Sequence, residues 1–552
     1  MCMTILAGRK ATQSGEILIG HNEDAPGRFI MQTHIVSKQR RKPNTHITFE
    51  PDLAELELST TRTNLLWSEA QTCSTNYSDS AFCDLYVNGH GVVICSNNCA
   101  DSREDSPELT NGGIGYGLRR LVAERAKSAR DAVNIACELV GKWGYASSGR
   151  SYAFADRDEI FVMQVVNGKH WAVQRVPDDE VAVIPNHYTI HEPDRKAPGY
   201  SELVNYAQKR GWYNPDDDTF DFARVYQSPE TWGLDKNTYR HVKAFEILLD
   251  MDLSELHKSE WQGLPFSIKP AKKVNIDTMK TILRSHKANP HFSKPLTICN
   301  TETLESTIIQ LRPNQDRIIL RKALGRPDYS PYIAWYFGLP DVPEDYEDSD
   351  SERALTEHFH LKPEAMDWKN NAWFRAMEIN AVSELLSAEK EETVCGKIRE
   401  FEDKQEREIE ELDPQIELSL RSRPDIARAM MKGLLLKWTN KSEKLTQTLR
   451  EELGVIIGEP LTAITEGQNF MVKLHSVNLG ELDTDKCICG TSCAEYNMWS
   501  KCTGIDEAEE CIEFSAGQWL ENAVSCFTDL YMLLVDKAGT KRVGSVKIQV
   551  RK

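Results

Sequence analysis

The first two dozen residues place two short apolar runs on either side of a polar segment, which is the pattern of a β-hairpin. Residues 3–7 and 16–20 form the apolar runs, and the segment between them is rich in turn-forming residues. In an antiparallel pair, the numbers of opposed residues add up to a constant. A turn centred near Thr12 therefore predicts that Cys2 lies opposite residues around Asn22.

This hairpin gives Cys2 a candidate chemical role. Removal of the initiator methionine, which the small side chain of Cys2 permits, would give the residue a free α-amine. Such an amine has a reference pKa of about 8 and can accept a proton from a neighbouring nucleophile near neutral pH. The returning segment 21–24, His-Asn-Glu-Asp, would bring a carboxylate beside that amine. An ordinary hairpin after a chance Met-Cys start explains these residues equally well.

A second group of polar residues follows another apolar run. Residues 92–95 (VVIC) predict a buried strand, which is expected to end in a loop at 96–98 (SNN). The side-chain amides of Asn97 and Asn98 are candidates to line a substrate-binding site. The alternative for each asparagine is a plain exit from the strand.

Further along the chain, one helical pattern stands between strand patterns. Residues 118–143 place apolar residues at i, i+3 and i+4, which predicts a helical segment. Alternating residues predict strands within 151–164, at 171–176 and at 181–184. This order indicates a mixed antiparallel α+β layout. The glycine-rich segment 112–117 has neither a GxGxxG motif nor a P-loop lysine, so its phosphate-binding signal is weak.

Length and charge narrow the class of protein. A chain of 552 residues is too long for one typical domain. The formal net charge of −18 argues against nucleic acid or an anionic membrane as a partner. No apolar run approaches the ~18 residues of a membrane span. The polar residues after residue 7 come too early for a signal peptide, which predicts a cytoplasmic protein if this is the native start. An exported form with a replaced leader is the alternative.

The chain is predicted to divide into three parts. Residues 2–340 form the largest domain, and 341–454 combine an acidic linker with a helical extension. Residues 455–552 alternate like strands and resemble a small β-sandwich in pattern. Disulfides, reduced core thiols and a metal site all stay open for this last part, because its cysteines show no CxxC pair. The clustered cysteines are Cys487, Cys489, Cys493, Cys502, Cys511 and Cys526.

Several segments of the first 340 residues together carry a family resemblance. They are Cys2 with TILAG, NED at 22–24, GIGYGLRRLVAERAKSARDAV at 113–133, FADRDEIFVMQVVNGKHWAVQRVPDDEVAVIPN at 154–186 and ICNTETLESTIIQLRP at 298–313. In this order and spacing they resemble the dipeptidase A family of N-terminal-nucleophile (Ntn) cysteine hydrolases, with the secernins as relatives. The resemblance implies an αββα sandwich, in which two stacked antiparallel sheets lie between helix layers. It also implies hydrolysis of dipeptides through a thioester on Cys2, with no cofactor.

The resemblance implies roles for individual residues as well. Asp24 matches the acid after the family's first hairpin, Asn186 an asparagine aimed at the developing oxyanion, and Arg240 an arginine close to the nucleophile. The alternatives are a turn residue for Asn186 and a surface cation for Arg240. Relatives commonly carry arginine where this chain has His21. An imidazole there is expected to weaken stabilisation of the thiolate or to make activity depend on pH.

The predicted function is therefore hydrolysis of dipeptides by Cys2, Asp24, Asn186 and Arg240, with His21, Asn97 and Asn98 lining the substrate site. One alternative is an amidase or acyltransferase that acts on non-peptide amides. Another is a secernin-like scaffold whose nucleophile is vestigial. The expected partners are short peptides, and a homo-oligomer is an open possibility.

Overall fold

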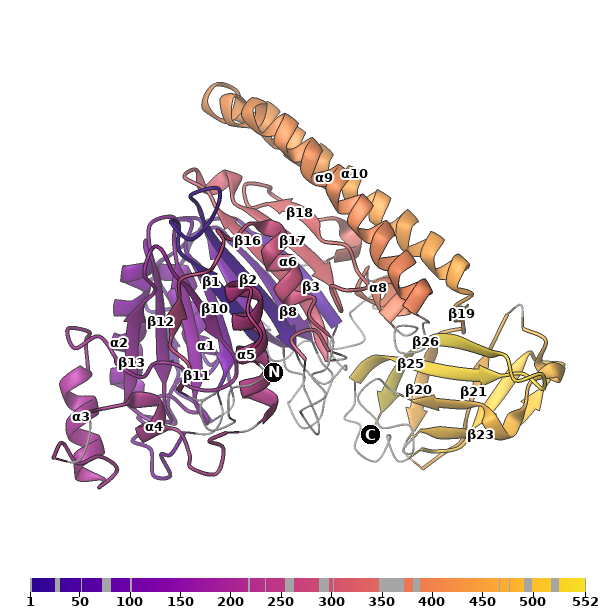
Figure 1. Cartoon of the computed structure of the whole chain (residues 1–552), viewed down its shortest axis with the longest axis horizontal. Helices are drawn as coiled ribbons and strands as arrows, with labels where there is room; N and C mark the ends of the chain where they lie inside the picture. The colour runs from indigo at the N-terminus through magenta and orange to yellow at the C-terminus, as the bar shows by residue number, and fades with distance from the viewer. Residues whose placement is uncertain are drawn as a thin grey trace.

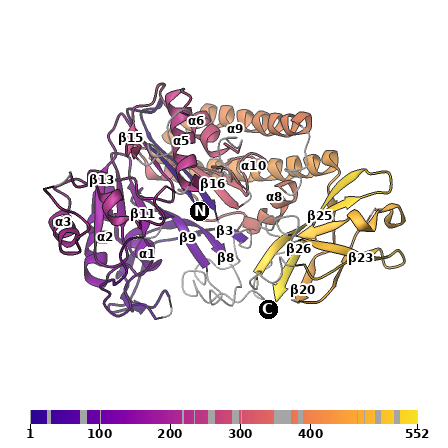
Figure 2. The ribbon, with the colours of Figure 1, turned by 60° about the horizontal axis from the view of Figure 1, so that its bottom comes forward.

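The computed structural model places most of the chain in two packed sheets, a helical pair and a C-terminal β-rich part (Figures 1 and 2). It describes residues 2–24, 30–50, 52–71, 81–99, 102–216, 219–233, 235–253, 263–286, 297–300, 302–346, 372–380, 388–465, 467–475, 477–490, 499–517 and 526–551. No helix in these ranges combines the length and the apolar character needed to cross a membrane.

Two seven-stranded antiparallel sheets form the body of the largest part. The first has the order β15-β14-β1-β2-β16-β17-β18, with β1 (Met3–Ala7), β2 (Ile17–Asp24), β14 (Val181–Ile184), β15 (Ser267–Ile268), β16 (Thr303–Leu311), β17 (Ile319–Leu324) and β18 (Ile333–Tyr336). The second has the order β13-β12-β11-β10-β9-β8-β3, with β3 (Ile30–Val36), β8 (Leu65–Gln71), β9 (Ala81–Asn88), β10 (Val93–Asn98), β11 (Arg150–Ala155), β12 (Ile160–Val165) and β13 (Trp171–Arg175).

Helices cover the outer face of each sheet, so the layers run helix, sheet, sheet, helix. Apolar side chains of α1 (Gly117–Arg125) and α2 (Ala129–Trp143) share a core with the second sheet. Those of α5 (Asp235–Leu249) and α6 (Ile276–Leu283) share another with the first sheet. Between the sheets, residues such as Ile19 and Val162 belong to a common apolar core. The predicted α+β class is confirmed.

The N-terminal hairpin forms as its sequence pattern predicts. In the antiparallel pair β1–β2, Met3 lies opposite Asn22 and Ala7 opposite Leu18. Cys2 directly precedes Met3, so it lies beside Glu23 and Asp24. This is one position further along β2 than Asn22, the predicted centre of its neighbours. Strand β2 also pairs with β16 on its other side, which fixes the end of the hairpin inside the sheet.

The helical prediction for residues 118–143 is confirmed, although the segment divides into α1 and α2, because Ser128, at the N-cap of α2, accepts a hydrogen bond from the Asp131 N–H and starts a new helix. The prediction of a loop at 96–98 is wrong. Residues 96–98 are no loop but the end of β10, where Asn97 lies opposite Ser151 of β11. Polar residues are tolerated in this buried strand because neighbouring side chains satisfy them.

The helical extension is the long antiparallel pair α9 (Ala388–Ser422) and α10 (Pro424–Leu453), which projects beyond the sheets in Figure 1. Carboxylates of α9 form ion pairs with cations of the largest part. Glu402 lies 2.6 Å from Arg284, and Glu406 lies 2.6 Å from Arg321 of β17. The charged face of this helix was expected to face solvent or to bridge to the rest of the chain, and these ion pairs show that it bridges.

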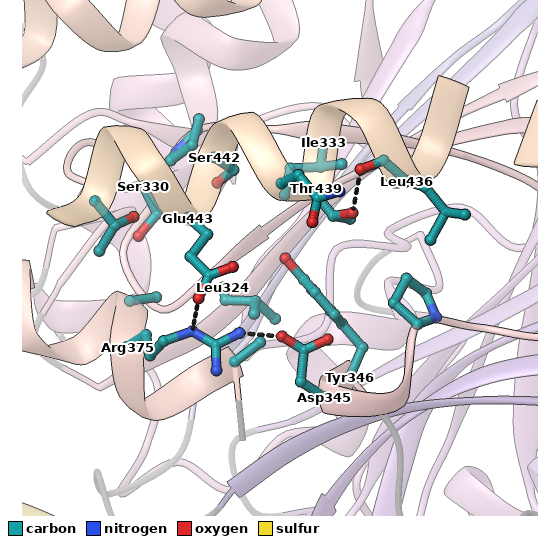
Figure 3. Close-up of a pocket in the computed structure, with 16 residues that line it drawn as sticks. Leu324, Ser330, Ile333, Asp345, Tyr346, Arg375, Leu436, Thr439, Ser442 and Glu443 are labelled. Carbon is teal, nitrogen blue, oxygen red and sulfur yellow. Dashed lines mark hydrogen bonds and ion pairs between the residues drawn. The ribbon is translucent and has the colours of Figure 1, made fainter. Parts of the chain in front are cut away.

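A cavity of about 230 Å³ lies between the extension and the edge of the first sheet (Figure 3). In it, Arg375 of α8 (Ala372–Asn380) forms ion pairs with Asp345 of the 3-10 helix η4 (Glu344–Tyr346) and with Glu443 of α10. These pairs join three separate elements across the cavity. Because Arg375 is matched by two carboxylates, the cavity lacks an uncompensated positive charge.

The C-terminal part is β-rich, as predicted, and its described strands form two groups that β23 joins into an eight-stranded sheet. The sandwich-like packing stays a prediction. The strands are β19 (Ile456–Ile457), β20 (Leu461–Thr465), β21 (Phe470–Lys473), β22 (Ile488–Gly490), β23 (Ser500–Asp506), β24 (Cys511–Phe514), β25 (Cys526–Val535) and β26 (Lys541–Arg551). Cys487, Cys489, Cys502 and Cys511 are free thiols. Cys493 lies outside the described residues.

The remaining elements are short and connect or cover the sheets. The helices are α3 (Tyr200–Lys209) and α4 (Phe222–Tyr226), and the 3-10 helices are η3 (Gln315–Arg317), η8 (Leu479–Glu481) and η9 (Thr484–Lys486). Two antiparallel pairs of two-residue strands join β4 (Gln39–Arg40) to β7 (Thr61–Arg62) and β5 (His46–Ile47) to β6 (Leu56–Glu57). The three-part division of the chain stays a prediction.

Candidate active site

Cys2 lies buried at the start of β1, a strand with neighbours on both sides. Its residue is only 3% exposed, and its backbone carbonyl accepts a hydrogen bond of 3.0 Å from Nη1 of Arg240. Arg240 comes from α5 and is fully buried, so the interpretation of this residue as a surface cation is wrong. The guanidinium therefore fixes the backbone of the candidate nucleophile.

The same guanidinium reaches Asn186, which follows β14. Nη2 of Arg240 donates to Oδ1 of Asn186 at 2.6 Å and to Oδ1 of Asn237 at 3.1 Å. The amide of Asn237 in turn donates to the backbone carbonyl of Asn186 at 3.1 Å. Nδ2 of Asn186 donates to the carbonyl of Asn98 at 2.5 Å. An amide group has two N–H donors, so Asn186 retains a second one for another acceptor.

Asp24 ends β2 close to the same point and is held by several donors. Its Oδ1 accepts from the Thr303 hydroxyl at 2.7 Å, and its Oδ2 accepts from the Asn300 amide at 3.1 Å. Nη1 of Arg240 lies 4.0 Å from Oδ2. Arg240 thus contacts the backbone of Cys2 directly, and the other two predicted catalytic residues, Asn186 and Asp24, lie next to Arg240.

Glu23 is a second carboxylate at the thiol, and the sequence analysis did not single it out. The Cys2 thiol donates to its Oε1 at a sulfur–oxygen distance of 3.6 Å. The side chains of a strand alternate between faces, and Thr4 lies opposite His21 in the register. Cys2, Thr4, His21 and Glu23 therefore share one face of the hairpin. The same alternation, applied to the sequence, would have placed Glu23 on the face of Cys2.

Hydrogen bonds on this face determine which nitrogen of His21 carries its proton. Nδ2 of Asn97 donates to the carbonyl of Ile184 at 2.9 Å, so its Oδ1 is the atom that accepts from the Thr4 hydroxyl at 2.6 Å. With its one hydrogen used, Thr4 can only accept from Nδ1 of His21, 2.9 Å away. Nε2 of His21 then faces Oε2 of Glu23 at 3.3 Å, and one proton must lie between them.

Burial is the main influence on the titration of these groups. It raises the pKa of the Cys2 thiol to about 12, with a further contribution from the charge of Glu23. It raises the pKa of Glu23 to about 7 and lowers that of His21 to about 4. The thiol is therefore protonated at rest, and Glu23, not the predicted His21, titrates near neutral pH.

Two buried arginines from the second sheet and its helix layer lie near this face. Arg119 of α1 and Arg150 of β11 donate to the Ser96 hydroxyl at 2.8 Å and 3.1 Å. Both guanidinium groups also lie over the ring of Tyr116, at 4.6 Å and 5.1 Å. Their charges lower the pKa of Glu23, although burial outweighs them. Sequence reasoning missed both arginines, because a single sequence does not show which cations of a helix or strand are buried.

The two predicted substrate-binding asparagines lie differently. The side chain of Asn97 is buried, and both ends of its amide are bonded within the protein. The side chain of Asn98 is exposed, and only its backbone carbonyl contacts Asn186. The structure thus brings Asn97 to the hairpin face and leaves the Asn98 side chain outside it.

The thiol, ring and carboxylate of Cys2, His21 and Glu23 offer ligand atoms that all lie within 4.8 Å of one another. Cysteine, histidine and glutamate are ligands of zinc-like cations. Among the described residues this group could hold a metal ion. Because a cation here would bind the thiolate itself, it would occupy the nucleophile.

With this geometry in hand, comparison with known proteins identifies the family. The model of Peptidase family C69 matches residues 1–378. The chain belongs to peptidase family C69. A dipeptidase of Bifidobacterium longum (strain NCC 2705) is 26% identical over an alignment of 410 residues, and the match covers 65% of this chain and 75% of that protein. A probable dipeptidase of Latilactobacillus sakei is 23% identical over an alignment of 404 residues, and the match covers 67% of this chain and 79% of that protein.

Among solved structures, a mutant of the conjugated bile acid hydrolase from Clostridium perfringens is similar to this C69 chain at 11% sequence identity. The match covers 61% of this chain and 93% of the hydrolase, with a TM-score of 0.34. A score this low supports no statement about the site. The family match reaches past the largest predicted domain and ends within α8, before the helical extension begins.

Proposed function

We propose that this C69 chain is a cysteine peptidase that hydrolyses dipeptides with Cys2 as an N-terminal nucleophile, within an αββα fold of the Ntn-hydrolase type. The family and the names of its relatives support peptide substrates. One observation carries the mechanism: Arg240 bonds both the Cys2 backbone and Asn186, so nucleophile and candidate oxyanion donor are held by a single group.

In the proposed mechanism the α-amine of Cys2, free after removal of residue 1, accepts the thiol proton as the sulfur attacks. Coupling proton transfer to attack is needed because burial keeps the thiol protonated at rest. The tetrahedral intermediate collapses to a thioester, and the amine passes the proton to the leaving amino group. Water then attacks the thioester, the same α-amine accepts the proton of the water, and the Cys2 thiol is released. Asp24, held by its own donors, would orient the amine.

The second N–H of Asn186 is the proposed donor to the oxyanion. Asn186→Ala is expected to lower kcat by ~10²–10³ while changing KM little, because the bond forms fully only in the transition state. Steady-state kinetics on one good dipeptide measures both constants. Asn64→Ala, at an exposed position whose side chain accepts from the Lys38 N–H, serves as a control that should leave kcat unchanged. An unaltered kcat in Asn186→Ala would reject the role in oxyanion binding and favour the alternative, a turn residue.

The proposal is tested by release of free amino acids from a panel of dipeptides, using protein whose N-terminal residue has been confirmed as Cys2 by mass spectrometry. Turnover of dipeptides supports the proposal. Turnover confined to non-peptide amides would favour the amidase or acyltransferase alternative. A folded protein with an intact terminal cysteine and no turnover of either class would favour the scaffold.

The C-terminal part is expected to be dispensable for the reaction. A chain ending near Leu453 should retain dipeptide hydrolysis, since every residue of the candidate site precedes the helical extension. The contacts that would be lost include the 3.7 Å ion pair of Lys547 in β26 with Glu378 in α8. Circular dichroism should show that the shortened chain is folded before its kcat is compared with that of the full chain. A folded but inactive product would reject this separation of parts.

A further inference from the structure

Two adjacent carboxylates lie beside the Cys2 thiol, and they differ in their partners. Asp24 accepts from Thr303 and Asn300 and lies near Arg240, so its oxygens are well satisfied. Within the described part of the chain, the partners of Glu23 are the Cys2 thiol and the His21 ring. A carboxylate has about four acceptor sites. Glu23 therefore retains the capacity to accept from a further donor.

The orientation of Glu23 is fixed by a chain of side chains that reaches the second sheet. Asn97 holds Thr4, Thr4 holds His21, and His21 holds Oε2 of Glu23. This leaves Oε1 directed at the thiol. A residue that merely filled space at this position would need no such series of bonds.

A dipeptide bound for attack would carry its α-ammonium group close to this oxygen. Standard bond lengths place the ammonium nitrogen about 2.5 Å from the scissile carbonyl carbon. Attack brings that carbon to about 3–3.5 Å from the sulfur, so the ammonium nitrogen lies within about 6 Å of it. Oε1 of Glu23 is 3.6 Å from the sulfur. A charge-assisted N–H···O bond of about 2.8 Å is therefore within reach.

We propose that Glu23 binds the α-ammonium group of the substrate and so selects short peptides with a free N-terminus, an inference that rests on the proposed function. An ammonium group at Oε1 favours the ionised carboxylate. Burial and Asp24 oppose ionisation of Glu23, while the charge of the chain's own N-terminus, Arg119 and Arg150 favour it.

The test compares kcat/KM for several dipeptides with kcat/KM for the same dipeptides acetylated at the N-terminus. The full-length protein with Cys2 at its N-terminus should prefer the free amines by at least ~10²-fold. Glu23→Gln should lower kcat/KM on the free amines by ~10²-fold more than on the acetylated peptides, so that the preference is largely lost. Glu23→Asp, which keeps the charge, should recover part of the preference.

Glu305→Gln is the matched control. Glu305 lies opposite Glu23 in the β2–β16 register and is also buried, but its carboxylate is 3.0 Å from Nζ of Lys322. Whatever this change does to the rate, the ratio between free and acetylated peptides should stay as in the wild type. An equal fall for both substrates in Glu23→Gln would show that Glu23 only positions the thiol, and would overturn the proposal.

A binding measurement distinguishes failure of the role proposed for Glu23 from failure of the proposed function. In full-length Cys2→Ala protein, calorimetry should show that free dipeptides bind more tightly than acetylated ones, and that adding Glu23→Gln removes at least ~10-fold of the difference. If the wild type hydrolyses no dipeptide but this difference is present, the proposed function fails and the role of Glu23 stands. Hydrolysis without preference for free amines, or binding without the difference, overturns the role of Glu23.

Discussion

Replacing Cys2 with alanine is expected to abolish dipeptide hydrolysis, lowering kcat by at least ~10⁴-fold, because removal of a covalent nucleophile leaves only binding and oxyanion stabilisation. No other described cysteine has a comparable set of neighbours. Cys95 and Cys99, for example, are equally buried thiols, but neither residue would carry a terminal α-amine to accept the thiol proton. Initial rates on the best dipeptide of the panel, with a detection limit below 10⁻⁴ of the wild type, measure the loss.

Two variants make this result specific. Cys2→Ser is expected to retain a trace of activity at most, since a hydroxyl is far harder to deprotonate than a thiol. Cys137→Ala removes a buried thiol from α2, away from the hairpin, and should leave kcat close to the wild-type value. Wild-type rates in folded Cys2→Ala would reject the nucleophile. A similar loss in Cys137→Ala would mean that the fall in kcat reflects a loss of protein stability and not the loss of a nucleophile.

The hairpin that carries Cys2 could be predicted because its signal is local. Two apolar runs and a turn set the register, and the structure places Met3 opposite Asn22, one position from the predicted pairing of Cys2. The contact between Arg240 and the Cys2 carbonyl joins residues 238 positions apart. No periodicity in the neighbourhood of either residue reports such a contact, so Arg240 and Asn186 became candidates only through the family resemblance.

The error at residues 96–98 has a physical cause. A run of serine and asparagine predicts a loop because buried polar groups are costly unless they are bonded. Here Ser96 accepts from two arginines, and Asn97 bonds Thr4 and Ile184. The partners come from other elements of both sheets, so the sequence could not show that they compensate the burial.

The role of His21 was only partly predictable. A histidine in place of arginine suggests a group that titrates near neutral pH. Full burial lowers its pKa to about 4, and the group that titrates near 7 is its neighbour Glu23. Which of two adjacent buried groups holds a proton depends on the Asn97–Thr4 chain, which is a tertiary feature.

An N-terminal extension should be as damaging as loss of the thiol. A protein that retains one extra residue ahead of Cys2 is expected to fold normally but to hydrolyse dipeptides at least ~10³-fold more slowly, because the amine becomes an amide and is no longer a base. His21 and His187 are poor substitutes as bases near neutral pH, because burial lowers the pKa of His21 to about 4 and that of His187 to about 3.

The sharpest form of this test uses one preparation before and after processing. A short leader that a specific protease removes directly before Cys2 gives an extended protein and its own matched control. Mass spectrometry should show the leader lost, and kcat should rise by at least ~10³-fold in proportion to the fraction processed. The same treatment of Cys2→Ala should yield no rise. Full activity before processing would show that an internal base serves the thiol, and would reject the N-terminal mechanism even if Cys2→Ala were inactive.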